Sequence, residues 1–413
     1  MKAISTFAIA VSMLAGGAVI ATPAVAQKNK KEAAQPAGPQ LSKEERAALI
    51  PLQTAVQAKD FATAATLVPA AQAAAKGADA RHILAGLQLQ MALGNNDQAG
   101  QAAAIEAMLA SGRVAQQDQA RLYRALSGLY TNLKQPERAS AALQRLGQLE
   151  PNSTDVILLQ AEADARANKH GEAVAGIERA IAAEKAAGRA VPENWYKRAL
   201  RFAYEAKRQQ DTMRVGQALL AAYPTPENWR DVLTIYRQQA NLDKAAETDL
   251  LRLLRAAKAM KGESDFYTLA SNLNNAGFPG EAKAVLDEGG QAKLINTNKD
   301  FFRALLNTTN SRVTEDRASL PSLATKANAA ADGKLALSTA DAFLGYRDYA
   351  RAAELYRLAL RKGTVDSNLV NTRLGMALAL AGQRAEAEAA FRAVTGNRAQ
   401  IAQFWMLWLA QRA

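Results

Sequence analysis

Residues 123–130 read YRALSGLY and contain the clearest structural pattern in the chain. Tyrosines stand at its two ends, with a leucine and a serine at the fourth and fifth places. Ala139 and Leu143 follow, and Pro151 closes the segment. An aromatic residue, leucine, a small residue and a second aromatic, followed by alanine, a bulky residue and proline, form a pattern typical of repeated helical pairs. The stretch therefore predicts one pair of short antiparallel helices.

The same pattern returns along the chain with a period near 35 residues. Alanines that correspond to Ala139 are separated by 35, 40, 34, 72, 37, 70 and 35 residues. They are Ala64, Ala99, Ala139, Ala173, Ala245, Ala282, Ala352 and Ala387. A fixed period of this length indicates a repeat architecture, in which each unit stacks on its neighbours.

Two long gaps in this series each predict one degenerate repeat. Inside the first gap, PENW at 192–195 recurs at 226–229, although Asp211 falls where the alanine of that unit is expected. Inside the second gap, residues 302–318 carry phenylalanine, leucine and alanine at suitable places but match the pattern poorly. We therefore expect about ten helical pairs and no strands.

With this period and these residue types, the chain resembles the tetratricopeptide repeat family over residues 43–398. The resemblance implies an all-α fold, a right-handed α-solenoid of about ten helical hairpins. A single hairpin has two apolar sides and cannot bury both alone, so each unit packs on the next. The resemblance also implies a non-catalytic scaffold whose concave groove binds a peptide or protein segment.

The N-terminal residues have the features of a signal peptide. Lys2 precedes a charge-free apolar stretch over residues 3–20, and Ala24 and Ala26 form a small-residue cleavage site. We expect residues 1–26 to be removed after Ala26 and the protein to reach the periplasm. Residues 27–42 are polar and lack an apolar period, which predicts a flexible leader before the first helix.

The C-terminal stretch 399–413 is apolar and contains Phe404, Trp405 and Trp408. A solenoid needs a last helix that covers its open end, so we expect a capping helix that buries these three residues against the last repeat. The alternative is a helix that docks on a partner or on a membrane surface.

Composition and motifs argue against an enzyme. The 413 residues include no cysteine and only two histidines, His82 and His170, which leaves little scope for thiol, imidazole or metal chemistry. Phosphate-loop, nucleophile-elbow and zinc-protease motifs are absent from the sequence. The repeats run almost to the last residue, so we expect no catalytic domain after them. The sequence predicts neither a cofactor nor a metal site.

The formal net charge of +12 bears on the partner. A basic surface usually suggests nucleic acid, but an exported protein rarely meets it, so we expect no nucleic-acid partner. Acidic polypeptide segments, anionic polysaccharide or lipid headgroups are the expected counterparts of such a surface outside the cytoplasm. The alternative function is an accessory role in envelope polysaccharide assembly or export, through binding of an anionic polysaccharide. A merely solvated, arginine-rich surface would also explain the charge. We expect no transmembrane span.

Candidate partner-binding residues follow from the resemblance, because the first helix of each pair lines the concave face in this family. They are Arg121, Arg124, Asn132, Arg230, Arg237, Tyr267, Asn274, Asn275, Arg303, Asn307 and Asn310. Asparagine can hydrogen-bond a peptide backbone as donor and acceptor, and arginine can bind a carboxylate through two bonds. The alternative for Asn274 and Asn275 is that they simply end a helix.

Overall fold

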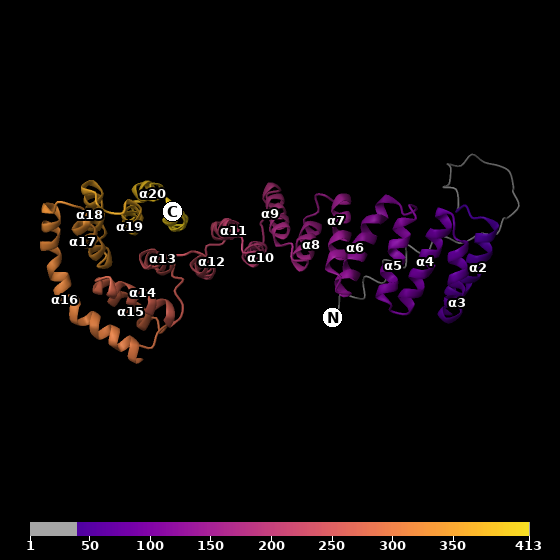
Figure 1. Ribbon diagram of the computed structural model, residues 1–413, viewed down its shortest axis with the longest axis horizontal. Coiled ribbons are helices and arrows are strands. Elements are labelled where there is room, and N and C mark those ends of the chain that lie inside the picture. Colours follow the sequence, from indigo (N-terminus) through magenta and orange to yellow (C-terminus); the bar gives the residue numbers. More distant parts are fainter. Residues whose placement is uncertain (1–38, 413) are drawn as a thin grey trace. The chain divides into compact units, whose positions relative to one another are not determined.

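The computed structural model describes residues 39–412. Within that range the chain forms 20 α-helices and one short 3-10 helix, and it contains no strand, as the repeat pattern predicts. The chain divides into two compact units, the first ending at Ala206 and the second beginning at Lys207. Figure 1 shows the helices in their order along the chain. The predicted signal peptide 1–26 and most of the predicted leader 27–42 lie outside the described residues.

Unit 1 contains four helical hairpins and one further helix. They are α2 (Lys43–Gln57) with α3 (Phe61–Ala74), α4 (Ala78–Gly94) with α5 (Gln98–Ala110), α6 (Gln116–Asn132) with α7 (Pro136–Leu149), α8 (Thr154–Arg166) with α9 (His170–Ala186), and α10 (Glu193–Glu205). Helix α2 begins with a capping box, in which Ser42 Oγ accepts from the Glu45 amide and Glu45 Oε2 accepts from the Ser42 amide.

Unit 2 contains eleven α-helices. They are α11 (Gln209–Ala222), α12 (Pro226–Gln239), α13 (Lys244–Ala256), α14 (Glu263–Asn275), α15 (Pro279–Gln291), α16 (Asp300–Ala329), α17 (Lys334–Gly345), α18 (Tyr349–Lys362), α19 (Ser367–Leu380), α20 (Arg384–Arg392) and α21 (Ala399–Ala410). The 3-10 helix η1 (Gly396–Arg398) leads directly into α21. No helix in the described part of either unit is long and apolar enough to span a membrane.

Most hairpins turn in the same way, through one residue with a left-handed backbone conformation. The residue before the N-cap of the second helix has a positive φ at Lys59 (58°), Lys134 (58°), Asn168 (59°), Gly277 (88°) and Arg347 (64°). This conformation ends the first helix and returns the chain at once, as in a Schellman-type C-cap. A short turn of constant length therefore keeps successive repeats in the same register.

The burial of the repeated alanines, which we call the crossing alanines, depends on this register. Six of the predicted alanines are almost fully buried: Ala64, Ala139, Ala173, Ala282, Ala352 and Ala387. Each of the six lies four residues after the N-cap of its helix. The structure corrects the other assignments: Ala99 is exposed, Thr212 rather than Asp211 takes the buried place in α11, and Ala246 is more buried than Ala245. The turn before α13 is one residue longer than the others, which shifts its register.

The prediction of a degenerate repeat around residues 302–318 is wrong. The chain instead forms a single 30-residue helix, α16. Residues 306–318 contain neither glycine nor proline, so nothing there ends the helix and starts a second one. Pro321 lies inside α16 without dividing it.

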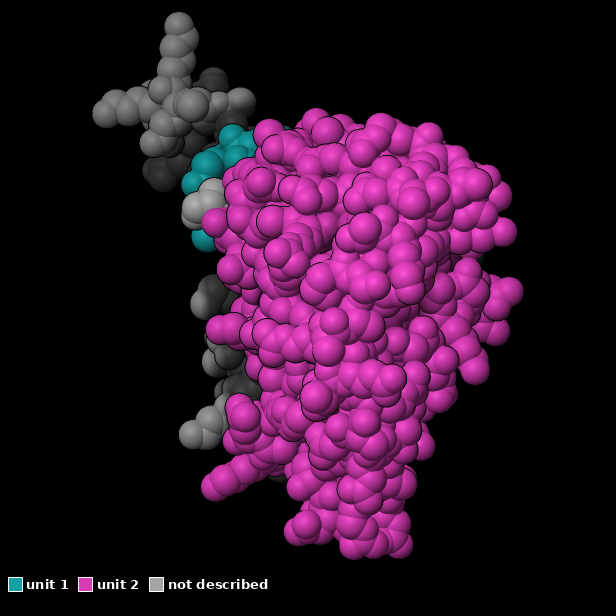
Figure 2. Space-filling model, turned by 90° about the vertical axis from the view of Figure 1, so that its left-hand side faces the viewer, with its two compact units in different colours: residues 1–206 teal, residues 207–413 magenta. Residues whose placement is uncertain are grey.

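The C-terminal helix closes unit 2 on itself. Helix α21 packs on α20 and also on α11, α13 and α19. Phe404 lies edge-on to Tyr236 of α12, with ring centroids 5.6 Å apart, and Trp229 Nε1 donates to Gln411 Oε1 at 3.2 Å. Phe404, Trp405 and Trp408 are buried, against the first helices of the unit as well as the last pair. Unit 2 is therefore a closed ring (Figure 1), and its side seen in Figure 2 is one continuous body.

Candidate functional site

A groove in unit 1 is the strongest candidate for a binding site. It has a volume of about 430 Å³. Its lining residues are Leu89, Leu93, Asn96, Gln98, Gln101, Ile105, Ala125, Ser127, Gly128, Leu129, Thr131, Asn132, Leu143, Leu159, Ala163 and Arg166. Most of them belong to α4, α6 and α8, the first helices of three successive hairpins. The groove therefore lies along the face on which stacking places the first helices of successive hairpins side by side.

The groove combines apolar side chains with neutral amides. Leu93, Leu129 and Leu159 provide the apolar part, and the side chain of Leu159 is 43% exposed. Gln98 and Asn132 add groups that both donate and accept hydrogen bonds. Apolar walls with a few polar groups are the usual lining of a ligand site.

The charges around the groove are basic. A neighbouring depression of about 400 Å³ is lined by Thr131, Lys134, Pro136, Ala139, Ala163 and Arg166, so it shares three residues with the groove. No carboxylate lines either depression. Arg166 approaches Glu162 only to 4.0 Å, and its side chain is 56% exposed. The end of the groove at Arg166 and Lys134 therefore attracts negative charge.

Buried polar contacts hold the helices that form the groove. Ser140 Oγ of α7 donates to Asp164 Oδ1 of α8 at 2.6 Å, and Gln160 Nε2 of α8 donates to Ser140 Oγ at 2.9 Å, so both bonds tie α7 to α8. Tyr130 donates to Glu106 Oε1 at 2.5 Å, which ties α6 to α5. Burial, followed by the contact with Glu106, raises the pKa of Tyr130 to about 12, so this phenol keeps its proton.

The predicted residues of unit 1 lie in different surroundings. Asn132, the last residue of α6, lines the groove. Arg124 Nη2 instead pairs with Glu150 Oε2 at 2.8 Å, and half-exposed Arg121 lies 3.8 Å from Asp118. Of these three residues, Asn132 is the one that the structure brings to the groove.

The predicted arginines of unit 2 pair with carboxylates of the same unit. Arg230 Nη1 binds Asp265 Oδ2 at 2.5 Å, which connects α12 to α14. Arg237 Nη2 binds Glu247 Oε1 at 2.5 Å, which connects α12 to α13. These pairs fasten neighbouring helices and already use the groups that a ligand carboxylate would need.

The remaining predicted residues lie on α14 and α16. Tyr267 is 39% exposed and lies edge-on to Phe301, with ring centroids 5.2 Å apart. Asn307 and Asn310 are exposed on α16, and Arg303 on the same helix pairs with Asp300. Two further residues, Asn274 and Asn275, are the last two of α14, as expected for residues that end a helix. The eleven predicted residues thus divide between the two units, three in unit 1 and eight in unit 2, and their role in partner binding stays a prediction.

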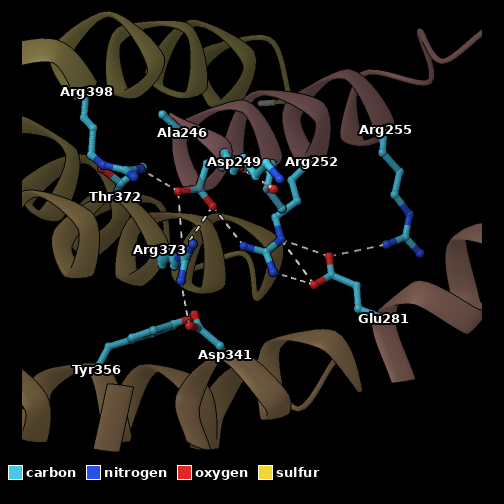
Figure 3. A network of polar contacts seen from close by, with 12 residues as sticks. Ala246, Asp249, Arg252, Arg255, Glu281, Asp341, Tyr356, Thr372, Arg373 and Arg398 are labelled. Atoms are coloured by element: carbon cyan, nitrogen blue, oxygen red, sulfur yellow. Dashed lines mark hydrogen bonds and ion pairs between the residues drawn. The ribbon is translucent and has the colours of Figure 1, made fainter. Parts of the chain in front are cut away.

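A buried ionic network in unit 2 was not found from the sequence (Figure 3). Asp249 of α13 is fully buried and binds three arginines. The distances are 2.9 Å to Arg252, 3.1 Å to Arg373 of α19 and 2.7 Å to Arg398 of η1. One carboxylate therefore joins helices that are separated by up to 149 residues in the chain.

Two further carboxylates extend the network. Glu281 Oε2 of α15 accepts from Arg252 Nη2 at 2.5 Å. Asp341 of α17 binds Arg373 at 2.6 Å and accepts a hydrogen bond from the Tyr356 hydroxyl at 2.6 Å. Arg252 and Arg373 thus each bridge two carboxylates, and the network runs from one side of the ring to the other.

The electrostatics of the network depend on how many arginines each carboxylate meets. Burial alone would raise the pKa of Asp249, but the attraction of three arginines outweighs it and lowers this pKa. Glu281 follows the same balance with Arg252 as its main partner, and its pKa is also lowered. For Asp341 burial dominates over the attraction of Arg373, so its pKa is raised. Buried charges of this kind are tolerated because each has a partner.

One sequence signal could have indicated this network. Asp249 and Arg252 lie three residues apart within DLLRLL, where four leucines surround the arginine. Charged residues on an apolar helix face are almost always paired when buried. The partners Arg373 and Arg398 could not be identified in this way, because they are distant in the sequence. Within residues 39–412 no group of three or more His, Asp or Glu side chains could hold a metal ion.

Helical hairpins repeated at a period near 35 residues, with a common turn and buried crossing alanines, define a tetratricopeptide-like helical-repeat protein. No family model and no curated sequence matches the chain. Among solved structures, it is similar to Naa15/Naa10 bound to HypK-THB, with 12% identity, a TM-score of 0.39 and coverage of 86% of this chain and 63% of that one.

Two further solved structures show the same kind of similarity. A tetratricopeptide repeat protein from Parabacteroides merdae aligns at 13% identity, with a TM-score of 0.25 and coverage of 70% of this chain and 98% of that one. The TPR2AB domain of yeast Sti1 in a complex with pHSP90 aligns at 12% identity, with a TM-score of 0.26 and coverage of 71% and 99%. At these values the similarities carry no argument about function.

Proposed function

We propose that this protein is an exported, non-catalytic scaffold that binds a peptide or protein segment in the groove of unit 1. The observation that carries the proposal is the groove of about 430 Å³ along α4, α6 and α8, with exposed leucine and amide side chains. Buried apolar side chains of a partner would supply most of the affinity, and the amides would bond its backbone.

The charge around the groove supports an acidic partner segment. Lys134 and Arg166 lie at one end, and no carboxylate lines the groove or the adjoining depression. An acidic residue on either side of an apolar segment would meet these two cations without repulsion. The partner class we propose is therefore an apolar segment with an acidic residue next to it.

Site-specific crosslinking in cells tests the proposal. A photo-crosslinking amino acid in place of Leu159 should capture a partner, because this side chain is 43% exposed in the groove. The control is the same substitution at Tyr204, which is 41% exposed in the same unit but does not line the groove. Arg166→Glu, combined with the probe at Leu159, should weaken capture. Equal capture from Leu159 and Tyr204, or none from Leu159, would contradict the groove assignment.

Export is tested separately. Removal of residues 1–26 would leave Gln27 as the first residue of the protein in a periplasmic fraction. N-terminal sequencing of the protein recovered from fractionated cells decides between this result and a chain that keeps Met1. A retained Met1 would overturn the proposed localisation while leaving the groove proposal intact.

A further inference from the structure

A second pocket lies in unit 2, where both ends of the ring meet. Its volume is about 380 Å³. Its lining residues are Gln209, Gln210, Met213, Arg214 and Gln217 of α11, Tyr236 of α12, Gly396 and Asn397 of η1, and Gln400 of α21. The pocket exists only because α21 returns to the first helices of the unit.

Neutral amides dominate the polar lining of this pocket. Gln209, Gln210, Gln217, Asn397 and Gln400 together provide five carboxamides, each with a donor and an acceptor. Arg214 is the single charged residue of the lining. Its Nη2 already binds Asp211 Oδ1 at 2.8 Å, within the same turn of α11. The pocket therefore offers many hydrogen bonds but little net charge.

Two lining residues carry polar groups without a partner. Tyr236 is only 3% exposed, its ring packs on Phe404, and its hydroxyl forms no hydrogen bond with another described residue. Burial raises the pKa of Tyr236, so the hydroxyl remains a donor. Nε2 of Gln400 is buried and also lacks a hydrogen-bond partner. Buried polar groups are nearly always bonded, so the unpaired Nε2 of Gln400, on the same pocket as the free Tyr236 hydroxyl, points to a ligand.

We propose that this pocket binds a neutral saccharide of one or two sugar rings. Vicinal hydroxyls or an acetamido group provide donors and acceptors at close spacing, which is what five carboxamides and a phenol can pair with. The volume lies in the range of small-molecule sites, whereas an extended peptide needs a longer groove. A ligand carboxylate would have to compete with Asp211 for the single arginine of the lining, whereas a neutral ligand would not.

The position of the pocket gives binding a measurable consequence for the ring. Residues of α11 and α12 line one part, and residues of η1 and α21 line the other. A ligand that contacts both parts binds the closed ring and not the open one. It therefore raises the melting temperature in a concentration-dependent way, since any ligand specific for the folded state does so.

Titration of the full chain with two neutral disaccharides, N,N′-diacetylchitobiose and cellobiose, tests the proposal. We expect saturable binding of at least one of them in the millimolar range or tighter, measured by calorimetry, with a matching rise in melting temperature. No saturable binding of either sugar, or saturable binding of an uncharged peptide at this pocket instead, would overturn the proposal.

Two variants assign the binding to this pocket. Tyr236→Phe keeps the ring on Phe404 and removes one hydroxyl, and Gln209→Ala changes an exposed side chain, so both should fold. Each should lower the affinity by about tenfold, the effect of one lost hydrogen bond. The matched control is Gln238→Ala, an exposed residue of α12 outside the pocket, which should bind as the unchanged protein does. Unchanged affinity in both pocket variants would contradict the assignment.

Discussion

The two units of this chain are built from the same helical hairpin, but only unit 2 closes on itself. In unit 1 the hairpins stack on their neighbours and leave a groove lined by exposed leucine and amide side chains. In unit 2 the last helix returns to the first ones, and a buried network of arginines and carboxylates runs across the ring. Stacking alone leaves the inner surface available to a partner, whereas closure fills it with the protein's own charges. A repeat sequence therefore does not by itself decide whether a solenoid stays open.

Closure also changes how stability is distributed. In an open stack, stability is close to a sum of repeat and interface terms, so damage stays local. In the ring, Asp249 and α21 connect helices from both ends of the unit. The loss of one of these contacts should therefore destabilise helices elsewhere in the unit. Four predictions, in order of decreasing effect, test this difference.

The largest effect is expected from removal of residues 399–413. The deletion takes away the buried Phe404, Trp405 and Trp408 and uncovers Tyr236 on the opposite side of the closure. Hydrogen exchange should become fast in α11–α13 as well as in α19 and α20, while α4–α8 of unit 1 serve as the internal control. An increase confined to α20 would mean that α21 acts only as a cap on the last pair.

Asp249→Ala should be the most damaging single substitution. It leaves Arg252, Arg373 and Arg398 buried without their shared counter-charge, which costs on the order of 3–5 kcal/mol. Urea denaturation should show this loss in the free energy of unfolding. Lys197→Ala in unit 1 breaks an exposed ion pair and should cost less than about 1 kcal/mol. Similar losses in both variants would contradict the structural role of the network.

Enlarging a crossing alanine should have an intermediate effect in both units. Ala139→Leu and Ala282→Leu each overpack a buried position and should lower the free energy of unfolding by about 1–3 kcal/mol. Ala99→Leu is the matched control, because Ala99 is exposed and a leucine there meets solvent. Thermal denaturation followed by circular dichroism distinguishes these cases. A strongly destabilised Ala99→Leu variant would show that the register of α5 differs from the one described.

The smallest effect is expected at the groove of unit 1. Leu159→Ala should change the free energy of unfolding by no more than about 0.5 kcal/mol, because the side chain is already 43% exposed. Leu146→Ala in the same unit removes a fully buried side chain and should cost about 2–5 kcal/mol. Chemical denaturation of the two variants provides the comparison. A large loss for Leu159→Ala would mean that this leucine serves the core and not a partner.

Much of the fold was predictable because its determinants are local. The spacing of Tyr123, Tyr130 and Ala139 identified a hairpin, and its period identified the repeats. Alanine four residues after an N-cap is buried wherever the preceding turn has the common length. The pattern failed at the longer turn before α13, at α16, where nothing ends the helix, and at α5, where the predicted Ala99 lies only two residues after the N-cap.

The candidate sites were predictable only in part. The resemblance directed attention to the first helices of the hairpins, and Asn132 of α6 lines the groove. It could not show that Arg124 and Arg230 pair with carboxylates of neighbouring helices, because such pairs depend on side-chain reach between repeats. The leucines of the groove were not singled out from the sequence, since their exposure depends on how closely the neighbouring hairpins approach.

The helices, their turns and their stacking order follow from the sequence, because helix periodicity, capping and short turns act over a few residues. The closure of unit 2, the contacts of Asp249 with Arg373 and Arg398, and the pocket between α11 and α21 arise only in the folded chain. These contacts join residues more than a hundred positions apart. Small errors in the rotation from one repeat to the next accumulate over that distance, so the meeting of the two ends follows from the summed geometry of the whole unit and from no single motif.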